Sequence, residues 1–181
     1  MDDKKERIKI FDDVFEYQKK EQIYDLALNS NFQIGWADTS IIEHSEKVFM
    51  YSRWDHQHIN FAKKKFLPFV KNQKLIKLID GRLPTKVILN CSIHSDIYLP
   101  HTHRDNDVLL YYINMDWKRE WNGETQFLSE NLNEIIFTNP YVPGRMVWFD
   151  GCIPHTIKTQ SFGGPKYRFS VSLFFRKSDE C

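Results

Sequence analysis

The chain has 181 residues, 41% of them hydrophobic and 15% aromatic, which predicts a single globular domain, residues 1–181, with a full hydrophobic core. Its 25 basic and 24 acidic residues leave a net charge of +1, which argues against nucleic-acid binding because phosphate backbones require a basic surface. No run of residues reaches the roughly 20 apolar positions of a membrane span, and the three cysteines form no CxxC pair. We therefore expect a cytoplasmic protein with no membrane partner and no disulfide framework.

The N-terminal part, about residues 1–80, is predicted to be mainly helical. Residues 12–29 combine N-terminal aspartates with an apolar stripe that includes Ile23 and Leu26, a pattern typical of an amphipathic helix. Residues 32–36 alternate apolar with polar or small side chains and predict a short strand. A second helical stretch covers residues 57–78, where Pro68 is expected to kink or divide the helix.

The C-terminal part, about residues 84–176, has the pattern of short strands and tight turns. Asn-Gly, Asn-Pro, Pro-Gly and Gly-Gly-Pro sequences separate the strand candidates. These candidates are residues 86–99, 108–115, 124–128, 134–138, 145–149 and 167–175. Many short strands at close spacing predict a barrel or sandwich rather than a parallel α/β sheet. The predicted class is α+β and mainly β, with helices packed on one sheet of a jelly-roll-like double sheet.

A possible metal site begins at the end of one strand candidate. His103 and Asp105 are two positions apart, so on an extended chain both side chains point to the same face and can reach one ion. His155 follows several strands later. Two imidazoles and one carboxylate are the ligands of non-haem iron(II) oxygenases, and they leave coordination positions open for chemistry.

The His-x-Asp spacing has competitors in this chain. Residues 94–96 (His-Ser-Asp) share it but lie inside a strand candidate, whereas His103 and Asp105 directly precede the apolar strand 108–115, where a barrel would open. His101 lies on the same strand face as His103 and could compete with it as a ligand. A His-x-Asp pair alone also arises by chance on a protein surface.

A possible anion site lies on the last strand. Residues 167–173 alternate apolar side chains with Arg168, Ser170 and Ser172. If the apolar face packs under the helices, Arg168 faces the interior, where a guanidinium is costly unless it meets an anion. A carboxylate bound by two N–H groups is the natural partner, with the hydroxyl of Ser170 beside it. The alternative is an arginine that faces solvent on a half-exposed strand.

Several segments of the C-terminal part form an ordered series over residues 100–175, somewhat under half of the chain. The series is His103-x-Asp105, Leu110–Trp117, Trp121–Thr125, Pro143–Asp150, Ile153–His155 and Arg168-x-Ser170. In this order, the segments resemble the 2-oxoglutarate- and iron(II)-dependent oxygenases, and in particular their prolyl 4-hydroxylase-like branch.

The resemblance implies a double-stranded β-helix that binds iron(II), 2-oxoglutarate and O2, with ascorbate as a supporting reductant. It implies that 2-oxoglutarate chelates the metal while its distal carboxylate pairs with Arg168, next to Ser170, and accepts a hydrogen bond from Tyr112. The implied reaction is hydroxylation of a prolyl residue or another amino-acid or peptide substrate, giving succinate and CO2. A free amino acid, a sugar or another small metabolite is an alternative substrate.

Two other functions are compatible with the same pattern. A cupin-like metal-dependent dioxygenase or isomerase would use the metal ligands on a small molecule without 2-oxoglutarate, but it would give Arg168 no purpose. A binding module without turnover would keep the barrel, but it would have no reason to keep His103, Asp105 and His155 together.

Overall fold

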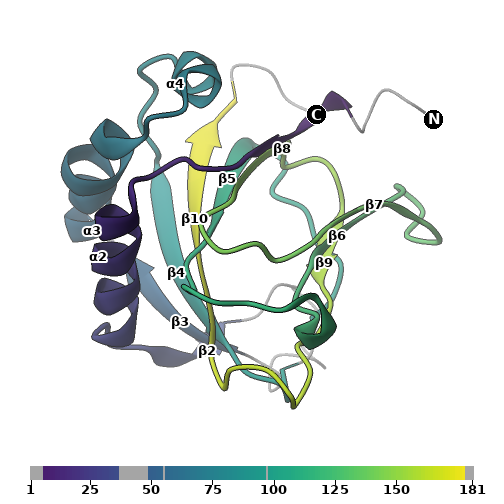
Figure 1. The fold of residues 1–181 in the computed structure, drawn as a ribbon. Coiled ribbons are helices and arrows are strands. Elements are labelled where there is room, and N and C mark those ends of the chain that lie inside the picture. The colour runs from purple at the N-terminus through teal and green to yellow at the C-terminus, as the bar shows by residue number, and fades with distance from the viewer. Residues whose placement is uncertain (1–5, 37–48, 55, 97, 178–181) are drawn as a thin grey trace.

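The computed structural model describes residues 6–36, 49–54, 56–96 and 98–177. Its larger sheet contains β1 (Ile8–Phe11), β2 (Gln33–Trp36), β3 (Phe49–Trp54), β4 (Lys86–Ser92), β5 (Asn106–Tyr112), β8 (Met146–Asp150) and β10 (Arg168–Arg176). Its smaller sheet contains β6 (Thr125–Leu128), β7 (Ile135–Asn139) and β9 (His155–Ile157). The strand orders are β1-β8-β5-β10-β4-β3-β2 and β7-β6-β9, and neighbouring strands are antiparallel. The predicted mainly β double sheet is confirmed, and it is a double-stranded β-helix (Figure 1).

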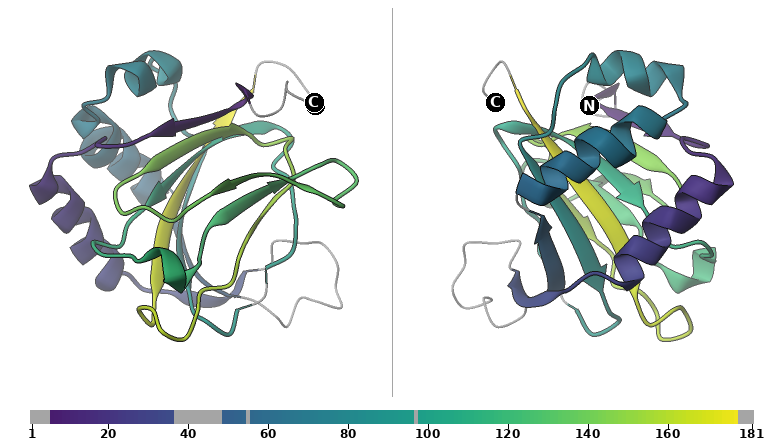
Figure 2. Two further views of the ribbon diagram at one scale, coloured as in Figure 1. Left: turned by 45° about the vertical axis from the view of Figure 1, so that its right-hand side comes forward. Right: turned by 90° about the vertical axis from the view of Figure 1, so that its left-hand side faces the viewer.

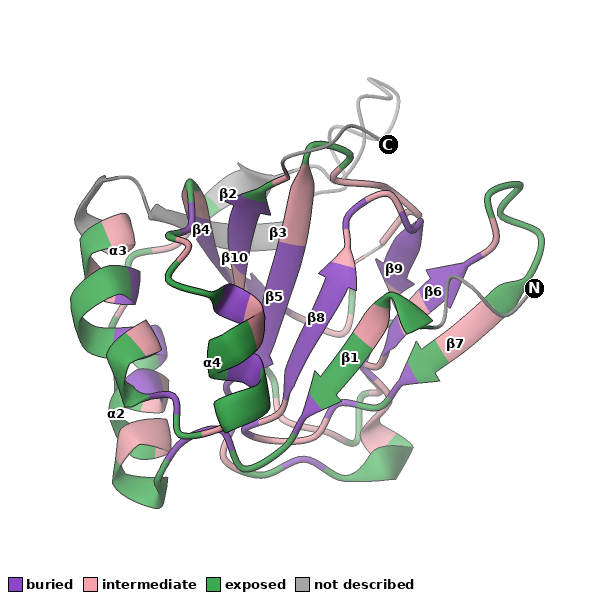
Figure 3. Ribbon diagram, turned by 90° about the horizontal axis from the view of Figure 1, so that it is seen from above, coloured by how far each residue is buried: buried purple, intermediate pink, exposed green. Residues whose placement is uncertain are grey.

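The helices cover one face of the larger sheet (Figures 1 and 2). They are α2 (Tyr17–Leu28), α3 (His56–Phe61) and α4 (Gln73–Ile79). The first hydrophobic core lies between these helices and the sheet, where Phe15, Ile23 and Leu75 belong to the same buried cluster as Leu89 and Val171. The second core lies between the two sheets. The central strands β5, β8 and β10 separate the two cores, and they are buried along most of their length (Figure 3).

The predicted helix over residues 57–78 is divided, as Pro68 led us to expect. After α3 the chain forms a five-residue π-helical segment, Ala62–Phe66, and then a single 3-10 turn, Leu67–Phe69. Proline has no N–H to donate and clashes with the preceding turn, which ends the regular helix. A new helix, α4, starts at Gln73, where the Asn72 side chain accepts hydrogen bonds from two backbone N–H groups of the first turn.

The strands differ from the prediction mainly at their ends. The strand predicted over residues 86–99 stops at Ser92 because the Asp96 carboxylate accepts the Ile93 N–H at 2.8 Å and folds the chain into a turn. Strands β1, β3 and β9 are not among the predicted strands, and each gains its partner from a distant part of the sequence. No helix in the described ranges has the length and apolar character needed to cross a membrane.

The last strand, β10, shows the predicted alternation. Phe169, Val171, Leu173 and Phe175 face the helices and belong to the first core. Ser170, Ser172 and Phe174 face the space between the sheets, where they line a cavity. Because β10 pairs with both β4 and β5 at the centre of the larger sheet, its inward-facing side chains lie at the middle of the molecule.

Candidate active site

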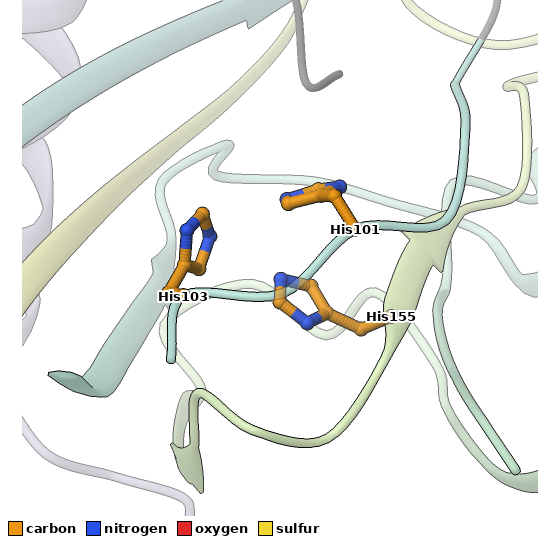
Figure 4. Close-up of side chains that lie close together, drawn as sticks. All are labelled: His101, His103 and His155. Carbon is orange, nitrogen blue, oxygen red and sulfur yellow. The ribbon is translucent and has the colours of Figure 1, made fainter. Parts of the chain in front are cut away.

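Three histidines meet at one end of the cavity between the sheets. His101, His103 and His155 each place a possible ligand nitrogen within 4.8 Å of the other two. The ring centroids are 4.8 Å apart for His101 and His103, 4.4 Å for His101 and His155, and 5.0 Å for His103 and His155. Figure 4 shows the three rings turned toward one another, two from one extended segment and the third from β9. One divalent ion could bind all three rings.

Backbone pairing positions these rings. His101 and His155 form an antiparallel bridge in which each N–H donates to the other residue's carbonyl oxygen at 3.0 Å. The His103 N–H donates to the Gly151 carbonyl oxygen at 2.7 Å. A Cβ on Gly151 would lie 2.4 Å from the His103 carbonyl oxygen, so only glycine allows the two segments to approach this closely. The backbone that carries the three histidines is therefore fixed by hydrogen bonds and close packing.

His103 and His155 are held in the neutral form that binds metals. Burial, together with the neighbouring His101 ring and Lys86, lowers the pKa of His103 to about 3. Burial and the two other imidazoles also lower the pKa of His155 well below its usual value. The Nδ1 atom of His155 lies 2.9 Å from the Ile153 carbonyl oxygen, a contact that favours the proton on Nδ1 and leaves Nε2 free to coordinate.

Asp105 lies outside the histidine cluster. The chain turns directly after His103, where the Asn106 N–H donates to the His103 carbonyl oxygen at 2.8 Å. This turn carries Asp105 away from the cavity, and its exposed side chain lines a surface cleft that His101 also borders. The structure thus brings together His103 and His155 of the predicted triad. The third member of the cluster is His101, the predicted competing ligand, rather than the carboxylate of Asp105.

The other His-x-Asp pair has structural partners instead. The His94 ring packs against Phe162, with ring centroids 4.1 Å apart. The Asp96 carboxylate accepts hydrogen bonds from the Ile93 N–H at 2.8 Å and from the Tyr98 hydroxyl at 3.3 Å. Neither residue belongs to the histidine cluster.

The cavity extends from the histidines into the space between the sheets. Its polar lining beyond the histidines consists of Asn90, Thr125, Ser170 and Ser172. Its apolar lining is Ile88, Val108, Leu110, Phe149, Ile157 and Phe174. The lining contains no acidic side chain from the described part of the chain. Such a cavity suits a small ligand whose polar ends are held at two separate points.

Arg168 lies behind this cavity and is completely buried. Its Nε donates to the Gly123 carbonyl oxygen at 2.9 Å, and its Nη1 lies 3.5 Å from the Ser170 hydroxyl. Its Nη2 is buried and has no hydrogen-bond partner, and no carboxylate in the described ranges forms an ion pair with it. The rings of Tyr112 and Tyr141 lie 5.5 and 4.8 Å from the guanidinium carbon. A buried guanidinium with an unused N–H group is a site for an anion.

Tyr112 connects Arg168 to the cavity wall. Its hydroxyl is 2.8 Å from the Thr125 hydroxyl and accepts a hydrogen bond from the Asn139 amide at 2.8 Å. Burial raises the pKa of Tyr112, so the phenol stays protonated and remains able to donate. Ser170 lies directly opposite Tyr112 in the pairing of β10 with β5. The three residues of the predicted anion site therefore lie together.

Several solved structures have a similar fold. A prolyl hydroxylase from Trichoplax adhaerens, solved with a peptide fragment of hypoxia inducible factor, is 16% identical over 94% of this chain and 83% of that chain, with a TM-score of 0.65. An oxidoreductase of the 2OG-Fe(II) oxygenase family from Burkholderia pseudomallei is 9% identical over 97% and 88%, with a TM-score of 0.67. A prolyl 4-hydroxylase from Pseudomonas putida is 13% identical over 94% and 93%, with a TM-score of 0.62. The chain has the fold of the 2-oxoglutarate and iron(II) oxygenases. No protein-family model and no curated protein sequence matched it.

Within this fold, the structure also shows which residues surround Arg168 and Tyr112, and the sequence alone did not identify them. Gly123 has a φ of +80°, and a Cβ there would lie 3.0 Å from the Trp117 ring and 3.3 Å from the Arg168 side chain. Thr125 and Asn139 both contact the Tyr112 hydroxyl, and no local pattern in the sequence assigns them to it. The Asn122-Gly123 turn signal was present in the sequence, but only the folded chain places it against the guanidinium.

Proposed function

We propose that this protein is an oxygenase that uses 2-oxoglutarate and O2, binds iron(II) at His101, His103 and His155, and binds the distal carboxylate of 2-oxoglutarate at Arg168. The observation that carries the proposal is the completely buried Arg168, whose Nη2 has no partner. Removing a guanidinium from water costs several kcal/mol unless an anion compensates it. A dicarboxylate that spans the cavity would meet Arg168 at one end and the histidine-bound metal at the other.

The chain's own residues supply binding, orientation and exclusion of water. Arg168 would fix one end of the cosubstrate, with the Ser170 and Tyr112 hydroxyls beside it. Leu110 and Phe149 line the cavity and keep bulk water from the metal end. Iron(II), when bound with 2-oxoglutarate, supplies the activation of O2 that hydroxylates a C–H bond and releases succinate and CO2.

For the substrate, we propose a prolyl residue or another amino-acid residue in a peptide. The support is the similarity of fold to the Trichoplax adhaerens prolyl hydroxylase, which was solved with a bound peptide fragment, and to the Pseudomonas putida prolyl 4-hydroxylase. Incubation with proline-containing peptides, iron(II), 2-oxoglutarate and ascorbate, followed by mass spectrometry, should show a gain of one oxygen atom on the peptide. Succinate formation that no peptide stimulates would direct the search to free amino acids and other small metabolites.

The cosubstrate is tested by an anaerobic titration of the iron(II)-loaded protein with 2-oxoglutarate. We expect the visible absorption band of a chelated 2-oxo acid in the wild type and its loss in His155→Ala, which removes a metal ligand. Arg168→Met should weaken 2-oxoglutarate binding at least tenfold while iron still binds, because truncating one partner of a buried charge pair costs about 2–5 kcal/mol. Arg176→Met removes an exposed arginine at the other end of β10 and serves as the matched control. Equal 2-oxoglutarate affinity in Arg168→Met and the wild type would contradict the assignment of the anchor.

One observation favours a second candidate, a cupin-like dioxygenase or isomerase that needs no 2-oxoglutarate. The protein ligands available to the metal are three imidazoles, a set that also binds other divalent metals. In such an enzyme the substrate itself would bind the metal, and Arg168 would hold an anionic group of that substrate. Iron binding without any 2-oxoglutarate band in the same titration would favour this candidate.

A further inference from the structure

The histidine cluster differs in charge from a site with two histidines and one carboxylate. His101 and His103 are two positions apart, the same spacing as His103 and Asp105. The side chains of His101 and His103 line the cavity, whereas that of Asp105 does not. In this arrangement His103 stands where the second residue of the His-x-Asp pair would place a negative charge. The protein ligands are then all neutral.

The charges around the cavity do not replace the missing carboxylate. No acidic side chain is among the cavity-lining residues of the described ranges. Cationic groups lie near both ends, since Lys86 acts electrostatically on His103 and the Nη1 atom of Arg168 lies 3.5 Å from the Ser170 hydroxyl. A divalent ion bound here would keep its full charge in a site of low dielectric constant, where an uncompensated charge is expensive.

Asp105 is held in place outside the cavity. Its own carbonyl oxygen accepts the Lys177 N–H at 3.0 Å, and the turn before it is closed by the hydrogen bond from the Asn106 N–H to the His103 carbonyl oxygen. These two hydrogen bonds fix the backbone on both sides of Asp105, and its side chain lies on the exposed side. The negative charge must therefore come from the ligand that enters the cavity.

We propose that the protein binds its metal through the three neutral histidines alone, with His103 in the place of a carboxylate, and that metal and 2-oxoglutarate consequently bind in a strongly coupled manner. This inference rests on the proposed function. The dianionic cosubstrate compensates both the metal and Arg168, so each ligand completes the charge balance that the other needs. By linkage, 2-oxoglutarate raises the metal affinity by the same factor by which the metal raises the 2-oxoglutarate affinity.

The test is calorimetric titration of the full-length apoprotein with Co(II), in the absence and presence of saturating 2-oxoglutarate. In the wild type we expect 2-oxoglutarate to raise the Co(II) affinity by a factor on the order of 100, near the upper end of the usual range for coupling. Glutarate is the matched ligand control, because it has both carboxylates but no 2-oxo group with which to chelate the metal. It should raise the Co(II) affinity much less.

Two variants separate the roles of the candidate ligands. His103→Asp supplies the carboxylate, so Co(II) should bind at least about tenfold more tightly without 2-oxoglutarate, and the coupling factor should fall by a similar amount. Asp105→Asn changes an exposed side chain and should leave both the Co(II) affinity and the coupling unchanged. Because this surface substitution leaves the buried cavity intact, it tests the ligand set even if His103→Asp does not fold.

The outcomes distinguish this inference from the proposed function. Loss of Co(II) binding in Asp105→Asn would show that the carboxylate is a ligand and would overturn the neutral site. A wild-type Co(II) affinity that is independent of bound 2-oxoglutarate would overturn the coupling, while the proposed function would stand. Absence of any 2-oxoglutarate binding, with Co(II) bound, would instead overturn the proposed function and the coupling with it.

Discussion

The buried Arg168 side chain should lower the stability of the ligand-free protein. If its side chain is kept for an anion rather than for folding, replacing it with an apolar side chain of similar length should stabilise the protein in the absence of ligands. Methionine fits this purpose because it is flexible and has a volume comparable to the buried part of arginine. The change proposed is Arg168→Met, measured without metal and without 2-oxoglutarate.

The expected magnitude follows from the contacts of the guanidinium. Transfer of the charge from water costs several kcal/mol. Against this stand one good hydrogen bond to Gly123, worth about 1.5–3 kcal/mol for a charged donor, one long contact of 3.5 Å to Ser170, and the faces of two tyrosine rings. Because Nη2 has no partner, the balance is unfavourable. We expect Arg168→Met to raise the free energy of unfolding by about 2 kcal/mol, or Tm by roughly 4–8 °C for a chain of this length.

The assay is urea unfolding followed by circular dichroism, in EDTA, with the wild type, Arg168→Met and the exposed control Arg176→Met. The control should change the free energy of unfolding by less than about 0.5 kcal/mol. A second series contains metal together with 2-oxoglutarate at about 100 times the Kd of 2-oxoglutarate. Binding of 2-oxoglutarate should then stabilise the wild type by about 2.7 kcal/mol. The Arg168→Met variant should gain much less from 2-oxoglutarate.

The reasoning would be refuted by a ligand-free Arg168→Met variant that is less stable than the wild type by 1 kcal/mol or more. Such a result would mean that the guanidinium is satisfied within the protein. The unused Nη2 group would then give no reason to expect an anion in the cavity.

Three further predictions concern packing and reactivity. Phe15→Ala should lower the free energy of unfolding by about 3–5 kcal/mol in urea, because this ring is 2% exposed and packs edge-on against two other aromatic rings. Gly151→Ala should destabilise the fold and weaken Co(II) binding, since the new Cβ would lie 2.3 Å from the Asn106 carbonyl oxygen and 2.4 Å from that of His103. The control Gly163→Ala, where the nearest atom is 4.0 Å away, should have neither effect. Equal Co(II) affinities of Gly151→Ala and the wild type would contradict the prediction. Cys91 should resist iodoacetamide from pH 7 to 10 in the folded protein, with site-resolved mass spectrometry as the readout, because burial, helped by Asp96, raises its thiol pKa to about 12 and alkylation requires the thiolate.

The sequence by itself determined those features that depend on local patterns. The alternation of residues 167–173 predicted which face of β10 packs under the helices, because neighbouring side chains of a strand point to opposite sides. Pro68 predicted where the second helix divides, since proline cannot continue the hydrogen bonding of a helix. The turn sequences and the ordered motifs also predicted the double sheet and its class of fold.

Only the tertiary structure decided which histidines form the cluster. Locally, His101-x-His103 and His103-x-Asp105 are equivalent, because both pairs place two potential ligands on one face of an extended chain. The choice between them depends on the bridge between His101 and His155, more than 50 positions apart, and on the turn that begins at His103. Likewise, the sequence placed Arg168 on an inward face, but its unpaired Nη2 depends on which side chains from other strands surround it. Such contacts join distant segments, so no local pattern in the sequence encodes them.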